Sequence, residues 1–142
     1  MDRTEFHDGF INFSADVLAL VEKLPKSFSG RHIARQLMRS GTSVGANMQE
    51  SRSAESRADF LHKMQIALKE IRETNYWMIL IRKRRMIPED LIRPLHDRCE
   101  ALTAMLAKSV ITTKKNSNLS ETASTQNSGF WTQDSEVLSS KY

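Results

Sequence analysis

The sequence predicts an all-α protein, an antiparallel up-down four-helix bundle with a disordered C-terminal tail. Three observations predict this fold class. Apolar residues recur at spacings of three and four along four successive segments, and no segment shows the alternation of a strand. Short links join these segments, which favours antiparallel neighbours. We therefore expect a bundle over residues 1–113 and a polar tail over residues 114–142.

The first two expected helices occupy residues 4–24 and 30–51. Pro25 ends the first, because proline lacks an N–H group and disfavours helical geometry in the residue before it. Ser40 and Gly41 interrupt the apolar stripe of the second, but its period continues past them. We interpret them as a place where a neighbouring helix comes close, rather than as a break. The two stripes are Phe6, Phe10, Phe13, Val17, Leu20 and Leu24, and then Ile33, Leu37, Val44 and Met48.

The third expected helix follows Ser56 and reaches about Arg85. Ser56 followed by Asp59 matches a capping box, which satisfies main-chain N–H groups at a helix start. In the fourth helix, Pro94 either kinks the first turns or marks the true start. The two stripes are Phe60, Met64, Ala67, Leu68, Ile71, Met78 and Ile79, and then Leu91, Leu95, Leu102, Met105, Leu106 and Val110.

The composition changes in the segment from Thr112 to Tyr142. This segment is rich in Ser, Thr, Asn and Gln, and its apolar residues come singly or as the pairs Phe130-Trp131 and Val137-Leu138. Such a segment cannot offset its ordering entropy by burial, so we expect it to be disordered. The Phe130-Trp131 pair is either a docking element for a partner or incidental, and the composition around it favours the second interpretation.

Several classes of protein are disfavoured by what the sequence lacks. There is no apolar run of eighteen residues, so we expect no membrane span. No basic region followed by an apolar stretch opens the chain, so we expect no secretory signal. The single cysteine, Cys99, rules out an internal disulfide and the usual cysteine-rich zinc sites. Together these features predict a cytoplasmic location.

The sequence also lacks the spacings of common catalytic and metal sites. Dimetal sites in helical bundles use Glu-x-x-His pairs, and none occurs here. No Gly-rich phosphate loop and no Gly-x-Ser-x-Gly motif is present. Cys99 shares a helix face with His96, but a small apolar core residue is the better interpretation. We expect no metal, no cofactor and no enzymatic activity.

Basic residues are the strongest charge feature. Residues 1–115 carry 20 Lys and Arg against 14 Asp and Glu. Such an excess attracts phosphates, although cations at a helix end also suit the helix dipole. The predicted nucleic-acid-binding residues are Arg31, Arg35, Arg39, Arg82, Lys83, Arg84 and Arg85. The alternative is an oligomeric protein-interaction scaffold whose cations bind no nucleic acid.

Polar residues also lie beside the apolar stripes of the two central helices. They are Asn47, Glu50, Glu70 and Glu73. Acids close to a core need partners, and Arg39, Lys69 and Arg72 are within reach. We interpret the four as an inter-helix polar network that fixes helix register, and a ligand site is the alternative.

Residues 36–77 read QLMRSGTSVGANMQESRSAESRADFLHKMQIALKEIRETNYW. This segment resembles the 23S rRNA intervening-sequence protein family, and the resemblance extends over about residues 6–112. Many members have Glu-Gly where this chain has Glu50-Ser51, so it is similar to the branch with another small residue there. The shared elements are Gln36-Leu37, Arg39-Ser40, Ser43-Val44, Asn47, Glu50, Ser56, Asp59-Phe60, Lys63, Lys69-Glu70, Glu73 and Tyr76-Trp77.

The resemblance implies an antiparallel bundle that assembles into a ring-shaped homo-oligomer, with a pentamer favoured. Members of the family are encoded within inserts in ribosomal RNA genes. Related accessory variability determinant proteins accompany reverse transcriptases in diversity-generating retroelements, so a reverse transcriptase is a conditional partner. The resemblance supplies no catalytic residue, and it fixes the fold more closely than the role.

Overall fold

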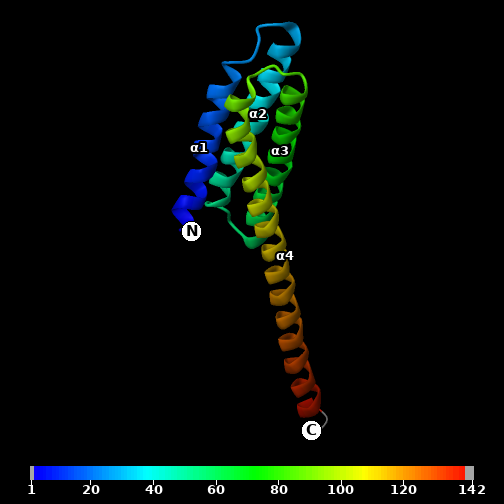
Figure 1. The fold of residues 1–142 in the computed structure, drawn as a ribbon. Helices are drawn as coiled ribbons and strands as arrows, with labels where there is room; N and C mark the ends of the chain where they lie inside the picture. The colour runs from blue at the N-terminus through cyan, green and yellow to red at the C-terminus, as the bar shows by residue number, and fades with distance from the viewer. Residues whose placement is uncertain (1, 140–142) are drawn as a thin grey trace. The chain divides into compact units, whose positions relative to one another are not determined.

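A computed structural model describes the backbone of residues 2–139 and the side chains of residues 2–126. The helices are α1 (Arg3–Val21), α2 (Phe28–Ser51), α3 (Arg57–Lys83) and α4 (Glu89–Ser139) (Figure 1). No residue within the described backbone forms a strand, and the all-α class is confirmed. Among the residues that the structure describes, no helix is long and apolar enough to cross a lipid bilayer. Contacts divide the chain into two units, Met1–Val110 and Ile111–Tyr142.

In the first unit each helix runs antiparallel to its two neighbours, as an up-down bundle requires. The cross-helix contacts establish this, because residue numbers rise along one helix as they fall along the next. Between α1 and α2, Ser14 contacts Gly45 and Val17 contacts Gly41; between α2 and α3, Arg39 pairs with Glu73 and Glu50 with Lys63. Between α3 and α4, Ile71 contacts Cys99 and Asn75 contacts His96; between α1 and α4, Gly9 lies beside Leu102 and Asp16 pairs with Arg98. The predicted topology is confirmed.

Side-chain caps set where the helices begin. The Ser27 hydroxyl accepts a hydrogen bond from the Gly30 N–H (3.1 Å), so α2 begins at Phe28, two residues before the predicted start. The Ser56 hydroxyl accepts from the Asp59 N–H (3.0 Å), as predicted for α3. These bonds satisfy main-chain donors that have no partner within the helix.

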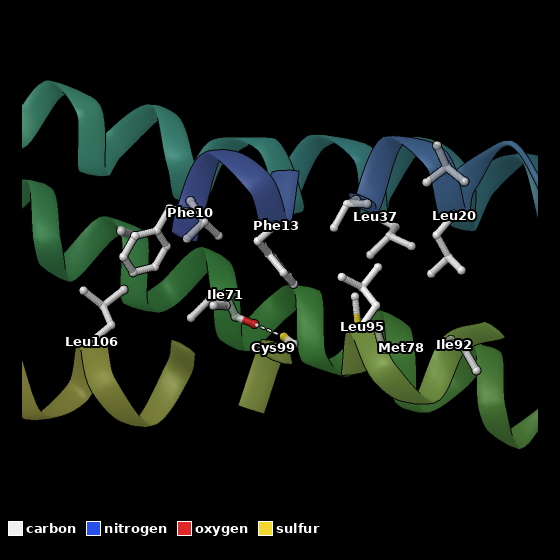
Figure 2. Close-up of a cluster of buried hydrophobic side chains, with 14 of the residues drawn as sticks. Phe10, Phe13, Leu20, Leu37, Ile71, Met78, Ile92, Leu95, Cys99 and Leu106 are labelled. Atoms are coloured by element: carbon white, nitrogen blue, oxygen red, sulfur yellow. Dashed lines mark hydrogen bonds between the residues drawn. The ribbon is translucent and has the colours of Figure 1, made fainter. Parts of the chain in front are cut away.

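The predicted stripes form the core, where side chains from all four helices of the first unit meet (Figure 2). Two predicted core residues are wrong, because Ile79 and Leu91 are 42% and 43% exposed. Thr74 on α3 and Ile92 on α4 are fully buried instead. A search for apolar residues at helical spacing does not detect Thr74, because threonine is polar. On α4, Ile92 has the same helical spacing as the other buried residues, whereas Leu91 lies at the edge of the buried face.

Small residues let α2 approach α1 closely, as predicted. A Cβ atom added at Gly41 would lie 2.7 Å from Val17 Cγ1, and one added at Gly45 would lie 2.9 Å from Ser14 Oγ. Both distances are too short for real atoms. The Ser14 hydroxyl uses the close approach to donate to the Gly41 carbonyl (3.1 Å). The stretch is therefore a packing surface and not a helix break.

The fourth helix decides between the two alternatives for Pro94, and it is longer than predicted. It begins at Glu89, so Pro94 lies inside it and does not mark its start. It also continues past Thr113, with hydroxyls such as Ser117 Oγ donating to the carbonyl four residues earlier (3.0 Å). A hydroxyl that donates to a carbonyl four residues earlier destabilises the main-chain hydrogen bonding of a helix only slightly. Disorder of residues 114–142 stays a prediction, and the Phe130-Trp131 side chains lie outside those described.

Candidate nucleic-acid interface

The α1–α2 and α3–α4 connections lie at the same end of the first unit, opposite the N-terminus (Figure 1). This is what alternating helix directions require. We call this end, residues 22–35 and 79–93, the basic end. It carries nine Lys and Arg against three Asp and Glu. The fold therefore brings Arg31 and Arg35 to the same end as the run from Arg82 to Arg85.

The last turn of α3 determines how this run is presented. Arg85 has a positive φ of 52°, in the left-handed region. The Met86 N–H donates to the Ile81 carbonyl and the Arg85 N–H donates to the Arg82 carbonyl, each at 3.1 Å. These two bonds are the Schellman pattern that closes a helix C-terminus. The turn follows α3 directly, so the run lies at the tip of the basic end.

The side chain of Arg82 links the end of α3 to the start of α4. Its guanidinium donates to the Glu89 carboxylate and lies 2.9 Å from His96 Nδ1. His96 Nε2 in turn lies 2.7 Å from Asn75 Oδ1. The hydrogen bond with Arg82 lowers the pKa of Glu89, and the same bond raises the pKa of Arg82. Arg82 therefore anchors the first turn of α4 and is a poor candidate for a free phosphate contact.

Two more of the predicted cations already have partners. Arg39 donates to Glu70 (3.1 Å) and to Glu73, and the hydrogen bond with Glu73 is the main cause of its raised pKa. Arg31 donates to the Lys26 carbonyl (2.9 Å) and so closes the α1–α2 connection. Four exposed cations of the predicted set form no ion pair within the described part of the chain, namely Arg35, Lys83, Arg84 and Arg85.

The predicted polar network separates into distinct contacts. Glu70 and Glu73 meet at Arg39, whereas Glu50 pairs with Lys63 (2.6 Å). Asn47 donates to the Ser43 carbonyl in its own helix (2.8 Å). None of these polar side chains is buried, and Glu50 is 59% exposed. Of the three predicted partners, Arg39 forms the ion pairs with Glu70 and Glu73, whereas Lys69 and Arg72 are exposed. Lys63, which was not predicted, pairs with Glu50.

Sequence reasoning missed residues that become identifiable once the order and direction of the helices are known. Glu50 lies at the end of α2 and Lys63 lies in the second turn of α3, and the antiparallel hairpin of these helices brings them together. Lys23 and Lys26 lie within the α1–α2 connection and also belong to the basic end. Neither the Glu50–Lys63 pair nor the two additional lysines can be recognised until the topology is known, because each depends on which segments lie side by side in the bundle.

Cys99 is a core residue, as predicted. Its side chain is fully buried and its Sγ lies 3.8 Å from the Ile71 carbonyl (Figure 2). Burial raises the pKa of the thiol to about 12, so the thiolate that a nucleophile needs is not formed near neutral pH. Within the described residues, no three His, Cys, Asp or Glu side chains gather as ligands for a metal ion.

Comparison with known proteins adds two findings. Residues 7–108 match the family of the 23S rRNA-intervening sequence protein, a range that lies within the first unit. A crystal structure from Bacteroides thetaiotaomicron, described as a protein of unknown function from the S23 ribosomal protein family, is 31% identical. The match covers 74% of this chain and 97% of that chain, with a TM-score of 0.69. No curated protein matches this chain.

Proposed function

Because this chain belongs to the 23S rRNA-intervening sequence protein family, we propose that it is a non-catalytic cytoplasmic bundle that associates with RNA or DNA through its basic end. One observation carries the proposal. Lys83, Arg84 and Arg85 lie exposed in a single turn, without an ion pair to any described carboxylate. A cation of this kind meets a phosphate without first breaking an existing pair.

The charge of the first unit is polarised along the bundle, which supports an end-on mode of binding. Residues 2–10, 47–66 and 103–110, at the opposite end, carry six Asp and Glu against five Lys and Arg. The basic end has a clear excess of cations instead. A phosphate backbone is therefore attracted to one end more strongly than to the other, which also orients the protein as it approaches.

Binding of this kind has a recognisable dependence on salt. Phosphate contacts release counterions, so affinity falls steeply between about 50 and 200 mM salt. The sequence contains no base-reading module, so we expect little sequence preference. Fluorescence anisotropy with ribosomal RNA fragments and with duplex DNA measures both properties. Absence of binding at low salt would contradict the proposal and favour a protein-interaction scaffold.

Self-association is the second part of the proposal. Large apolar side chains of α1, α2 and α3 are exposed, and include Ile11 (50%), Leu18 (42%), Met38 (42%) and Tyr76 (55%). Exposed apolar surface of this kind marks interaction sites. We infer a ring-shaped homo-oligomer, with a pentamer as the expected number. Light scattering at micromolar protein tests this, and a monomer mass would contradict it.

The scaffold alternative draws on the same apolar side chains and assigns them to another protein. A reverse transcriptase is a candidate partner if the gene lies in a retroelement. Trp77 is partly buried, and its ring meets that of His32 edge-on with the centroids 5.9 Å apart. It therefore contributes less to such a surface than Tyr76 does. Binding to a partner protein without any affinity for nucleic acid would favour the scaffold.

A further inference from the structure

Arg85 occupies a backbone conformation that favours glycine. Over the described backbone it is the one residue other than glycine with a positive φ. A side chain at such a position crowds the following carbonyl oxygen, and the position after a helix C-terminus is most often glycine for this reason. Local stability therefore disfavours arginine here.

The arginine side chain does not help to hold the turn that it strains. The turn is closed by main-chain bonds, from Met86 to Ile81 and from Arg85 to Arg82, which glycine would form equally well. The Arg85 side chain is exposed and forms no ion pair or hydrogen bond with the described residues. Strain without local compensation is typical of functional positions.

The surroundings of Arg85 suit an anion. Arg82, Arg85, Ile87, Pro88 and Glu89 line a hollow of about 490 Å³. The Glu89 carboxylate is already bound by Arg82, so Arg85 supplies the charge that remains without a partner. A hollow of this volume admits a phosphate group with several waters, since one water occupies about 30 Å³.

We propose that Arg85 is a dedicated phosphate contact, held by its left-handed backbone beside the Arg82–Glu89 pair where it meets the backbone of RNA or DNA. This inference rests on the proposed function and deepens it, because it assigns different roles to adjacent cations. Arg82 holds the turn, and Arg85 contacts the ligand. Arg84 has an ordinary helical conformation, so its backbone carries no strain of this kind.

The test compares Arg85→Gly with Arg84→Gly, because both remove one charge and only the first relieves the left-handed strain. Melting temperature is followed by circular dichroism, and Kd for duplex DNA and for a ribosomal RNA fragment is measured at one low salt concentration. Arg85→Gly should raise the melting temperature by about 4 °C or more. It should weaken binding by about tenfold or more and reduce the salt slope by about 1. Arg84→Gly should not raise the melting temperature and should weaken binding less.

Three results would overturn the inference while leaving the proposed function standing. They are wild-type affinity in Arg85→Gly, an equal loss of affinity in both variants, and a melting temperature that falls in Arg85→Gly. Absence of binding by the unaltered protein would instead remove the proposed function, and this inference with it. Because the informative substitution is expected to stabilise the fold, loss of folding does not confuse the result.

Discussion

The side-chain hydroxyl of Thr74 lies 2.9 Å from that of Ser40, inside the core between α3 and α2. Both side chains are fully buried. The Arg39–Glu73 pair lies at the same level of the bundle, but Arg39 is 47% exposed there. Solvent screens such a surface pair, whereas a buried hydroxyl without a partner is costly. The buried pair is therefore the stronger determinant of the register between α2 and α3.

Replacing Thr74 by valine should lower the free energy of unfolding by about 1–3 kcal/mol, because it removes the closer partner of the Ser40 hydroxyl. That hydroxyl would retain only the Leu37 carbonyl, at 3.5 Å. The double variant Ser40→Ala/Thr74→Val should cost less than the sum of the single changes. Urea unfolding measures these values. As a control, Glu73→Gln should cost less than about 1 kcal/mol, and a larger cost there than in Thr74→Val would reverse the ranking.

Gly41→Ala should destabilise the bundle by about 1–3 kcal/mol, because the new Cβ overlaps Val17. Combining it with Val17→Ala should recover part of the loss. Gly9→Ala is the matched control, since its new Cβ would lie 4.0 Å from the nearest atom, Leu102 Cδ2. That change should stabilise α1 by about 0.5–1 kcal/mol. If both alanines have the same effect in urea unfolding, close packing at Gly41 is refuted.

His7 should make stability depend on pH. It is buried, its Nδ1 has no partner within the described residues, and burial followed by the charge of Arg52 lowers its pKa below 6.5. The unfolded chain therefore takes up a proton at a higher pH than the folded chain does. Stability is lost as pH falls through about 6.5 and levels off below the folded pKa.

Urea unfolding between about pH 7.5 and pH 5.5 isolates this effect from most carboxylates, which titrate lower. The variant His7→Gln should lose less stability over this range than the unaltered protein does. An identical loss in both proteins would show that another group is responsible.

Cys99 should resist thiol reagents in the folded protein. Its side chain is fully buried and its pKa is raised to about 12, so neither access nor the thiolate is available at pH 8. Reaction with an aromatic disulfide reagent should follow unfolding, at a rate that urea accelerates. Rapid labelling of the native protein without urea would be inconsistent with the buried position.

The apolar period was sufficient to predict the fold, because burial of one face imposes it on each helix. Phe10, Phe13 and Val17 are fully buried as predicted. The errors occur where burial and hydropathy diverge. Thr74 is polar but has a partner inside the core, and the apolar Ile79 is partly exposed at the basic end. A pattern of residue types does not show whether a polar side chain has a partner inside the core, or whether an apolar side chain lies near an exposed end of the bundle.

The candidate interface was less predictable than the fold. Sequence shows where charges lie along the chain but not which of them already have partners. Arg39 and Arg82 therefore looked equivalent to Arg35 and Arg84 until the cross-helix pairs were placed. The left-handed backbone of Arg85 was not visible either, because a helix C-terminus followed by arginine carries no glycine signal.

The most direct test of the account compares two variants that lose the same three charges at opposite ends of the bundle. One is Lys83→Gln/Arg84→Gln/Arg85→Gln, and Arg82 is left unchanged because it anchors α4. The other is Arg3→Gln/Arg52→Gln/Arg57→Gln. Kd for a ribosomal RNA fragment and for duplex DNA is measured as a function of salt. We predict weak binding and a salt slope smaller by about 2–3 in the first variant, with nearly unchanged binding in the second. Equal weakening in both variants would show that net charge, and not the basic end, attracts the nucleic acid.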